Sequence, residues 1–202
     1  MLTIALTGGI ATGKSTFARL FLELAPGTAF FDCDASVQQL LLKQEIIAAI
    51  AAALGPDIQS PDGLLDRRRL RELVFDHPEH RKILEGILHP LVREECRAAQ
   101  QTAREAGTAP FFLADVPLLY ESGFPLTRDI EIVVACGPAT QRARLMERSR
   151  FSEELAEKIV AAQLPLAEKM HRARIVLWNG GPPASLRRQT ELFLAWLREW
   201  RR

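Results

Sequence analysis

The chain has 202 residues, enough for one substantial hydrophobic core with smaller appended parts. Hydrophobic residues make up 48% and charged residues 25%, which excludes a disordered chain. The net charge of +1 gives no general argument for nucleic acid or membrane binding, and no apolar run approaches the roughly 20 residues of a membrane-spanning helix.

The three cysteines, Cys33, Cys96 and Cys136, lie far apart and lack metal-ligand spacing. A disulfide framework and a zinc site are therefore not expected. No basic leader precedes the first strand-like run, which argues against a signal peptide. Together these features favour a cytoplasmic protein.

The first 56 residues predict a strand, a glycine-rich turn and a helix, followed by a second strand and helix. An apolar run at 2–6 is typical of a buried strand. The helix after the turn carries apolar residues at helical spacing, namely Phe17, Leu20, Phe21 and Leu24. A strand at 28–31 follows, and the alanine-rich segment 36–54 is predicted as one helix that ends at Gly55.

The middle of the chain has a different character. Helical patterns occupy about 66–75, 78–88 and 90–106, with Pro78 and Pro90 each placed in a first turn. No strand signal occurs between 57 and 109. Residues 57–106 are therefore predicted to form a helical insertion.

Strands resume after the insertion and alternate with helices. The predicted strands are 111–114, 130–135 and 175–178, and the predicted helices are 138–149, 152–163 and 183–200. This alternation predicts an α/β fold with a mostly parallel sheet covered on both faces. Residues 1–56 and 107–202 would form this core.

The turn after the first strand reads G-x-x-x-x-G-K-S from Gly8 to Ser15. Its place between a strand and a helix predicts a phosphate-binding loop. Backbone N–H groups and the helix dipole would bind phosphate oxygens, Lys14 would reach the β- and γ-phosphates of ATP, and Ser15 would ligate Mg²⁺. The candidate nucleotide-binding residues are Gly8, Gly9, Ala11, Thr12, Gly13, Lys14, Ser15 and Thr16. We expect a negative φ at Ala11, where a methyl group would then be tolerated.

Three aspartates follow predicted strands. Asp32 and Asp34 come after the second strand, and Asp115 ends the run 111–114. A carboxylate at this edge of the sheet can accept the proton of an attacking hydroxyl or hold Mg²⁺. The alternative role for the first two is to cap a helix, and for Asp115 to be an ordinary strand-end residue. Function is favoured for Asp34, and the alternatives weigh equally for Asp32 and Asp115.

Cationic side chains recur further along the chain. Arg144 and Arg148 share a helix face before a break near 149–152, where they could close over a triphosphate. The cluster 67–71 is read mainly as a solvated helix face. A metal site at His77 and His80 is possible, but a solvated turn is favoured.

Several segments together resemble the dephospho-CoA kinases. The matching segments, in the family's order over nearly the whole chain, are Leu6-Thr7-Gly8-Gly9-Ile10 with Gly13-Lys14-Ser15-Thr16, Asp32-Cys33-Asp34, Asp62-Gly63-Leu64-Leu65-Asp66-Arg67, Leu88-His89-Pro90, Asp115-Val116-Pro117-Leu118-Leu119-Tyr120-Glu121, Gln141 with Arg144 and Arg148, Gln163, and Asn179. The loop alone is generic, whereas D-V-P-L-L-Y-E with D-G-x-L-D-R and L-H-P is specific.

This resemblance implies ATP-dependent phosphorylation of the ribose 3′-hydroxyl of dephospho-CoA, the last step of coenzyme A synthesis. It also implies a five-stranded P-loop core, a helical CoA-binding region and a small helical lid at about 140–165. Asp34 becomes the candidate base or hydroxyl-orienting group, favoured over Asp32. Candidate acceptor contacts are Arg67, His89, Pro117, Leu118 and Leu119, candidate metal contacts are Ser15, Asp32 and Asp115, and Arg144 and Arg148 become lid residues. The expected protein is a monomer or weak homo-oligomer that binds neither nucleic acid nor membrane.

The chain departs from the family's usual pattern at Ala11-Thr12, Cys33, Lys158 and Arg174. The alternatives are another small P-loop kinase, acting on a nucleoside monophosphate or a sugar acid, and a nucleotide-binding regulatory or nucleic-acid-associated module. The second alternative depends only on the arginine cluster at 67–71.

Overall fold

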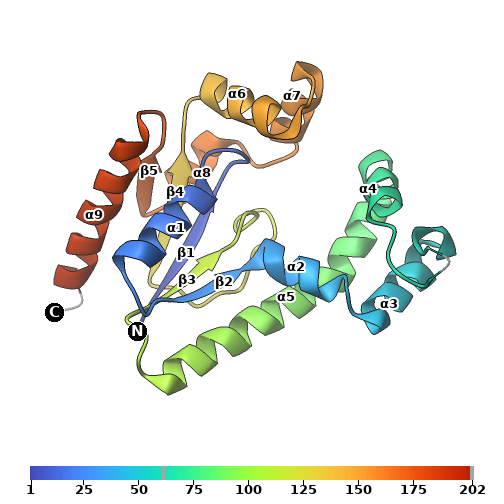
Figure 1. The fold of residues 1–202 in the computed structure, drawn as a ribbon, viewed down its shortest axis with the longest axis horizontal. Coiled ribbons are helices and arrows are strands. Elements are labelled where there is room, and N and C mark those ends of the chain that lie inside the picture. Colours follow the sequence, from blue (N-terminus) through green and yellow to red (C-terminus); the bar gives the residue numbers. More distant parts are fainter. Residues whose placement is uncertain (61, 201–202) are drawn as a thin grey trace. The chain divides into compact units, whose positions relative to one another are not determined.

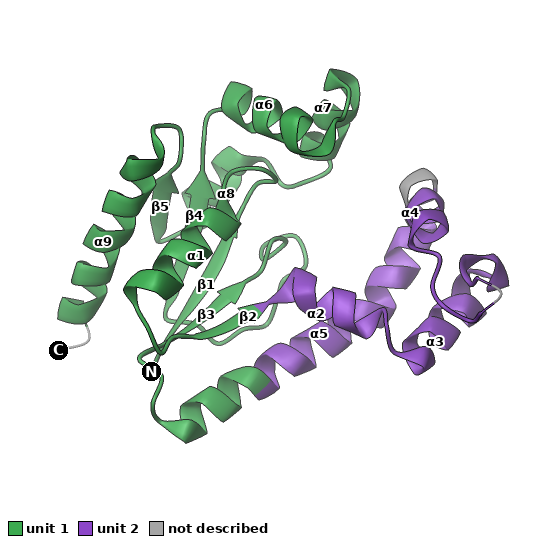
Figure 2. Ribbon diagram, in the orientation of Figure 1, with its two compact units in different colours: residues 1–31, 99–202 green, residues 32–98 purple. Residues whose placement is uncertain are grey.

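The computed structural model describes residues 1–60 and 62–200, apart from the side chains of Phe75 and Asp76. The chain divides into two compact units (Figure 2): unit 1 comprises residues 1–31 and 99–202, and unit 2 comprises residues 32–98. The positions of the units relative to one another are not determined, and each is described by itself.

A five-stranded sheet with the order β2-β3-β1-β4-β5 organises the fold (Figure 1). Its strands are β1 (Leu2–Gly8), β2 (Ala29–Asp32), β3 (Phe111–Asp115), β4 (Ile130–Ala135) and β5 (Ile175–Trp178). Strand β1 pairs in parallel with β3 and β4, and β4 pairs in parallel with β5. The chain leaves β1 toward β2 on one side and leaves β4 toward β5 on the other. Adjacent β1 and β4 therefore form a topological switch point, where open sheets bind ligands.

Helices α1 (Lys14–Leu24) and α9 (Pro183–Trp200) cover one face of the sheet (Figure 1). Alternate strand residues such as Ile4 and Ile132 point into this layer, where they are fully buried. Phe21 fills its centre, with its ring 5.5 Å from Phe111 and 6.1 Å from Phe193. This aromatic layer fixes the helix that follows the glycine-rich loop.

The other face carries the end of α5 (Pro78–Ala106). Thr3 alternates with Ile4 along β1, and its hydroxyl accepts a hydrogen bond from the Gln100 amide of α5 at 2.8 Å. The predicted α/β architecture with helices on both faces of a parallel sheet is confirmed. Three further helices complete unit 1: α6 (Pro138–Ser149), α7 (Glu153–Ala161) and α8 (Leu166–Arg172). Helix α8 follows Pro165 and had no counterpart among the predicted elements.

Unit 2 is mainly helical in its described residues, with one isolated antiparallel bridge between Gln59 and Leu65. It contains α2 (Cys33–Leu40), α3 (Gln44–Leu54), the short 3₁₀ helix η1 (Pro56–Ile58), α4 (Arg67–Asp76) and the first part of α5. The predicted single helix at 36–54 is wrong, because the chain bends between α2 and α3. On a straight helix, residues nine positions apart lie on opposite faces. The bend allows Leu41 and Ile50 to join one hydrophobic cluster.

Helix α5 runs without interruption through Pro90, which we had expected to begin a new helix. Pro90 lacks the N–H that would bond to the carbonyl of Gly86, four residues earlier. Both residues are exposed, so water can satisfy that carbonyl. The break predicted between 88 and 90 is therefore wrong.

The compact helical unit does not coincide with the predicted insertion at 57–106. Helices α2 and α3 also belong to unit 2, and the last turns of α5 belong to unit 1. Among the described helices, no single one is long and apolar enough to cross a bilayer. Helices α2 and α3 meet these two criteria only when taken together, and they are bent by 84° relative to each other.

Candidate active site

The glycine-rich loop connects β1 to α1 and needs glycine at both of its fixed positions. Gly8 has φ 154°, and a Cβ there would lie 2.4 Å from the carbonyl oxygen of Val134 on β4. Gly13 has φ 102°, and a Cβ there would lie 2.1 Å from Nδ2 of Asn179. Because both conformation and space exclude a side chain, the two glycines fix the path of the loop.

Ala11 adopts φ 57°, the left-handed conformation that favours glycine. The predicted negative φ is therefore wrong. The loop imposes this value locally, because the Thr12 N–H and hydroxyl both donate to the Gly9 carbonyl, at 3.4 and 2.9 Å. Thr12 is fully buried, so its side chain stabilises the loop through an internal hydrogen bond.

Amide side chains from distant segments hold the loop in place. Nδ2 of Asn179, which follows β5, donates to the Thr12 carbonyl at 2.9 Å. Ile10 is held twice: its carbonyl accepts from Nε2 of Gln141 at 2.8 Å, and its N–H donates to Oε1 of Gln163 at 2.9 Å. These three residues were among those that resemble the family, but their spacing along the sequence did not predict what they do. Only the folded chain shows that they act on one loop.

A pocket of about 710 Å³ opens over the loop within unit 1. Its lining residues are Ala11, Gly13, Lys14, Ser15, Thr16, Arg144, Glu147, Arg148, Asn179, Gly181, Pro183 and Leu186. The structure thus brings the first turn of α1 together with both arginines predicted for the lid. Helix geometry leaves the N–H groups of Ser15 and Thr16 without intrahelical partners, which favours anion binding at this end of α1.

Arg144 lines the pocket with a half-buried side chain. Its Nη1 is buried and has no hydrogen-bond partner among the described residues. Nearby, burial raises the pKa of the Cys136 thiol, while the charge and hydrogen bond of Arg144 oppose that rise. A guanidinium matches a phosphate oxygen in both charge and hydrogen-bond geometry.

Asp115 ends β3 beside the loop strand, in register with Leu6 of β1. Its side chain is only 6% exposed, whereas Ser15 is exposed on α1. A carboxylate and a hydroxyl are the hard oxygen donors that Mg²⁺ prefers. The donor chemistry of these two residues therefore fits a magnesium ion.

Asp32 and Asp34 lie where the chain passes from β2 into α2. Asp32 is the N-cap of α2, where its Oδ1 accepts the Ala35 N–H at 3.0 Å. Asp34 lies in the first turn of α2 and is exposed. The capping role considered for the pair belongs to Asp32.

Arg67 and His89 belong to unit 2. Asp66 caps α4 by accepting the N–H groups of Arg68 and Arg69, both at 3.0 Å, and this places Arg67 at the first helical position. Arg67 is exposed and donates to the carbonyl of Gln38 at 3.4 Å. His89 lies half-buried within α5, so it does not cap a helix.

The segment after β3 contains the other predicted acceptor contacts. Pro117 and Leu118 are half-buried, but Leu119 is 2% exposed and belongs to the interior. Tyr120 donates to Oε2 of Glu131 at 2.8 Å, and burial together with this bond raises its pKa. Of the three predicted contacts in this segment, Pro117 and Leu118 therefore keep a partly exposed side chain.

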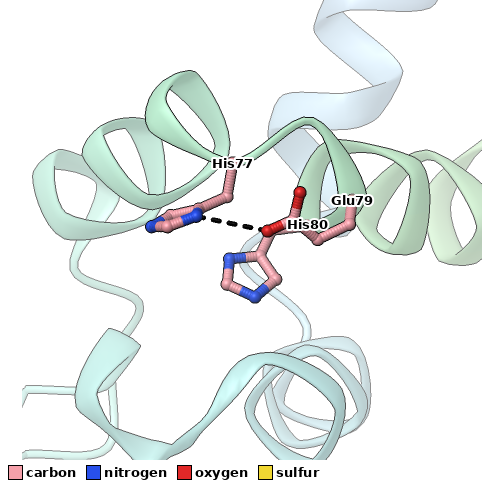
Figure 3. A group of neighbouring side chains, drawn as sticks. All are labelled: His77, Glu79 and His80. Carbon is pink, nitrogen blue, oxygen red and sulfur yellow. Dashed lines mark ion pairs between the residues drawn. The ribbon is translucent and has the colours of Figure 1, made fainter.

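The histidine pair lies at the junction of α4 and α5 (Figure 3). Nδ1 of His77 and Oε1 of Glu79 are 3.2 Å apart, with side chains 51% and 63% exposed. The ligand atoms of His77, Glu79 and His80 lie within 4.8 Å of one another. The exposure of His77 and Glu79 agrees with the favoured interpretation of a solvated turn, whereas His80 is half-buried and its Nδ1 has no hydrogen-bond partner among the described residues.

Two departures from the family pattern have partners in the structure. The guanidinium of Arg174 stacks 4.9 Å from the ring centre of Trp200 and 6.0 Å from that of Trp196, both on α9. Lys158 pairs with Glu154 at 2.7 Å on the surface of α7. Arg174 therefore packs on the terminal helix, away from the residues that line the pocket.

A parallel sheet with a glycine-rich loop at its switch point, and arginines beside that loop, defines the P-loop kinases. A model of the dephospho-CoA kinase family matches residues 2–184. The dephospho-CoA kinase of Geobacillus kaustophilus is 42% identical over 200 residues, which cover 98% of this chain and 96% of the relative. The chain therefore belongs to the dephospho-CoA kinase family, and the resemblance predicted from its motifs is confirmed.

Solved structures agree with this assignment. A crystal structure of a Thermus thermophilus protein matches with a TM-score of 0.77 and 34% identity, covering 96% of both chains. The dephospho-CoA kinase from Campylobacter jejuni matches with a TM-score of 0.73 and 25% identity, covering 99% of this chain and 98% of the other. As a family member, the chain is a kinase that transfers phosphate to a hydroxyl group.

Proposed function

We propose that this protein phosphorylates the ribose 3′-hydroxyl of dephospho-CoA with ATP, the last step of coenzyme A synthesis. The observation that carries the proposal is the pocket over the glycine-rich loop, in a chain that belongs to the dephospho-CoA kinase family. The pocket joins the first turn of α1, including Lys14, with the side chains of Arg144 and Arg148. This set of donors suits the polyphosphate of a nucleotide.

On the donor side, loop N–H groups and the start of α1 bind the phosphates, while Lys14 neutralises charge on the group being transferred. Nζ of Lys14 lies 3.1 Å from the Gly9 carbonyl, so the amine is already held at the loop. Arg144 and Arg148 approach the same pocket from α6. Their positive charge stabilises the negative charge of the phosphoryl group in the transition state.

For the metal, we propose that Ser15 and Asp115 would hold Mg²⁺ and that Asp32 would contribute through water. A magnesium ion held by these residues would supply positive charge against the polyphosphate. Asp32 already uses Oδ1 to cap α2, which leaves Oδ2 for such a role.

On the acceptor side, Asp34 takes the proton of the 3′-hydroxyl as it attacks. Asp34 is exposed in the first turn of α2, where a substrate can approach it. Arg67, His89, Pro117 and Leu118 contact dephospho-CoA, with Arg67 suited to a phosphate group.

We further propose that the protein acts in the cytoplasm as a monomer or weak homo-oligomer, with no nucleic acid or membrane partner. Its three cysteines, all among the described residues, are buried and form no disulfide, as a reducing compartment favours.

An acceptor screen tests the proposal. The purified protein is incubated with ATP and Mg²⁺ and with dephospho-CoA, AMP or gluconate, and ADP release and product mass are measured. Coenzyme A is the matched control, because its 3′-hydroxyl already carries phosphate. Of these four compounds, we expect only dephospho-CoA to cause ADP release. Phosphorylation of AMP or gluconate without turnover of dephospho-CoA would contradict the proposal and favour another small P-loop kinase.

A further inference from the structure

Lys169 on α8 is the most deeply buried charged residue among those described, with 0% of its surface exposed. Its ammonium group has three N–H donors, and three oxygen atoms of the protein lie within reach to accept them. Nζ lies 2.6 Å from Oε1 of Glu121, 3.2 Å from the Pro117 carbonyl and 3.3 Å from the Gly8 carbonyl. Every donor of this cation is therefore used within the protein, and none remains for a substrate.

The two carbonyls bound by Lys169 come from different sides of the proposed site. Gly8 is the first residue of the nucleotide loop, and Pro117 begins the segment assigned to the acceptor. The hydroxyl of Thr7 also donates to the Pro117 carbonyl, at 3.0 Å. Lys169 and Thr7 thus fix Pro117 relative to the end of β1.

The anionic partner extends the network to the segment between α7 and α8. Oε1 of Glu121 also accepts the N–H of Leu164, at 3.1 Å. The preceding residue, Gln163, accepts the N–H of Ile10 in the loop. One ion pair therefore ties together the loop, the acceptor segment and the C-terminal end of the predicted lid, all within unit 1.

Stability alone does not explain a charged pair at this position. A buried ion pair costs desolvation energy, and apolar residues of similar volume often stabilise a fold equally well. Two directed hydrogen bonds from Lys169 instead fix the positions of two carbonyls, which an apolar side chain cannot do. Phosphoryl transfer depends mainly on the alignment of donor and acceptor.

We propose that Lys169, anchored by Glu121, is a positioning residue that sets the alignment of the nucleotide loop with the acceptor segment. This inference rests on the proposed kinase function. Lys169 acts through Gly8 and Pro117 and does not touch the reacting atoms.

The test compares Lys169→Met with the exposed control Lys82→Met, which makes the same substitution on α5. For each variant, ADP affinity is measured by calorimetry, and kcat per ADP-binding site is measured at saturating ATP and acceptor. We expect kcat of Lys169→Met to fall by about 10²-fold, because small misalignments of this kind have such effects. ADP affinity should stay within about threefold, since the phosphate-binding N–H groups remain.

Uncoupled hydrolysis distinguishes positioning from a purely structural role. A misaligned acceptor should raise the ratio of ATP hydrolysis to acceptor phosphorylation in Lys169→Met, whereas a merely less stable enzyme keeps the wild-type ratio per active site. A Lys169→Met protein with wild-type kcat and ratio per site would overturn the inference.

Glu121→Gln keeps the test decisive if Lys169→Met does not fold. It retains size and an acceptor oxygen but removes the charge that orients Lys169, and we expect a fall in kcat of about tenfold with a raised hydrolysis ratio. Unchanged values in this variant would also overturn the inference. If the wild-type enzyme phosphorylates a different acceptor, the proposed function fails, and the same variants are measured with that acceptor.

Discussion

The nucleotide loop of unit 1 and helix α4 of unit 2 place their polar side chains in opposite ways. Around the loop, Thr12, Lys169 and Asn179 are buried and bonded to backbone groups. On α4, Arg67 and Arg68 are exposed, and Arg68 makes a surface pair with Glu72 at 3.8 Å, while Arg67 reaches the Gln38 carbonyl at 3.4 Å from an exposed position. Buried, fully bonded side chains give a rigid site, whereas exposed arginines keep their rotamer freedom until a ligand orders them.

This difference indicates how the two regions contribute to turnover. A loop fixed before the nucleotide binds can stabilise the transition state without reorganising, so its residues should affect kcat. Side chains ordered by the acceptor contribute binding that is shared by ground and transition states, so they should affect KM. Asp34 is the expected exception, because it belongs to unit 2 but is proposed to act in the chemical step.

The largest effect is expected for Asp34→Asn. Loss of the base should lower kcat by about 10²–10⁴-fold while ATP affinity is retained. Steady-state kinetics and nucleotide binding provide the measurement. Asp32→Asn is the neighbouring comparison, and the smaller effect is expected there because Asp32 serves α2 as its cap. Near-normal turnover of Asp34→Asn would contradict a role for Asp34 in the chemical step and make Asp32 the next candidate.

Lys14→Ala should lower kcat/KM by about 10²–10³-fold, because one preorganised charge is lost from the transition state. Lys82→Ala, an exposed lysine of α5, is the control and should behave as wild type. If Lys14→Ala raised only the KM for ATP, the loop would act by binding alone, and the proposed difference between the loop and α4 would be contradicted.

Arg67→Ala should raise the KM for dephospho-CoA by about tenfold with kcat unchanged, the size expected for one charged hydrogen bond. Arg68→Ala removes a cation at the next position and should change neither constant. Initial rates at varied acceptor concentration separate the two. Equal effects in both variants would indicate a general influence of surface charge and argue against a specific contact.

The smallest effect is expected for Ala11→Gly. Glycine removes the strain of φ 57° but increases the freedom of the unfolded chain, so we expect a net stabilisation of about 0.5–1 kcal/mol. Activity should remain largely intact. Urea unfolding measures the change, and Ala48→Gly, in the exposed face of α3, should instead destabilise by about 1 kcal/mol. A destabilised Ala11→Gly would contradict the strain assigned to this residue.

Local patterns were sufficient where short-range chemistry decides the structure. The Gly8–Ser15 spacing identified the loop, and the boundaries of β4, β5 and α9 agree with the predicted ranges 130–135, 175–178 and 183–200. The bend between α2 and α3 and the continuous α5 were missed. Both depend on burial and solvent exposure that neighbouring residues do not encode.

By itself, the sequence determined the strand–loop–helix unit, the parallel sheet and the family, because glycine spacing, hydrophobic period and motif order are local or linear properties. The tertiary structure decided that Asp32 caps a helix, that Ala11 adopts a left-handed conformation, and that Lys169 lies against Gly8 and Pro117. Lys169 is separated from Gly8 by 161 positions along the chain, and no local pattern marks it. Buried polar contacts of this kind are satisfied only when distant segments meet, so only the folded chain can assign them.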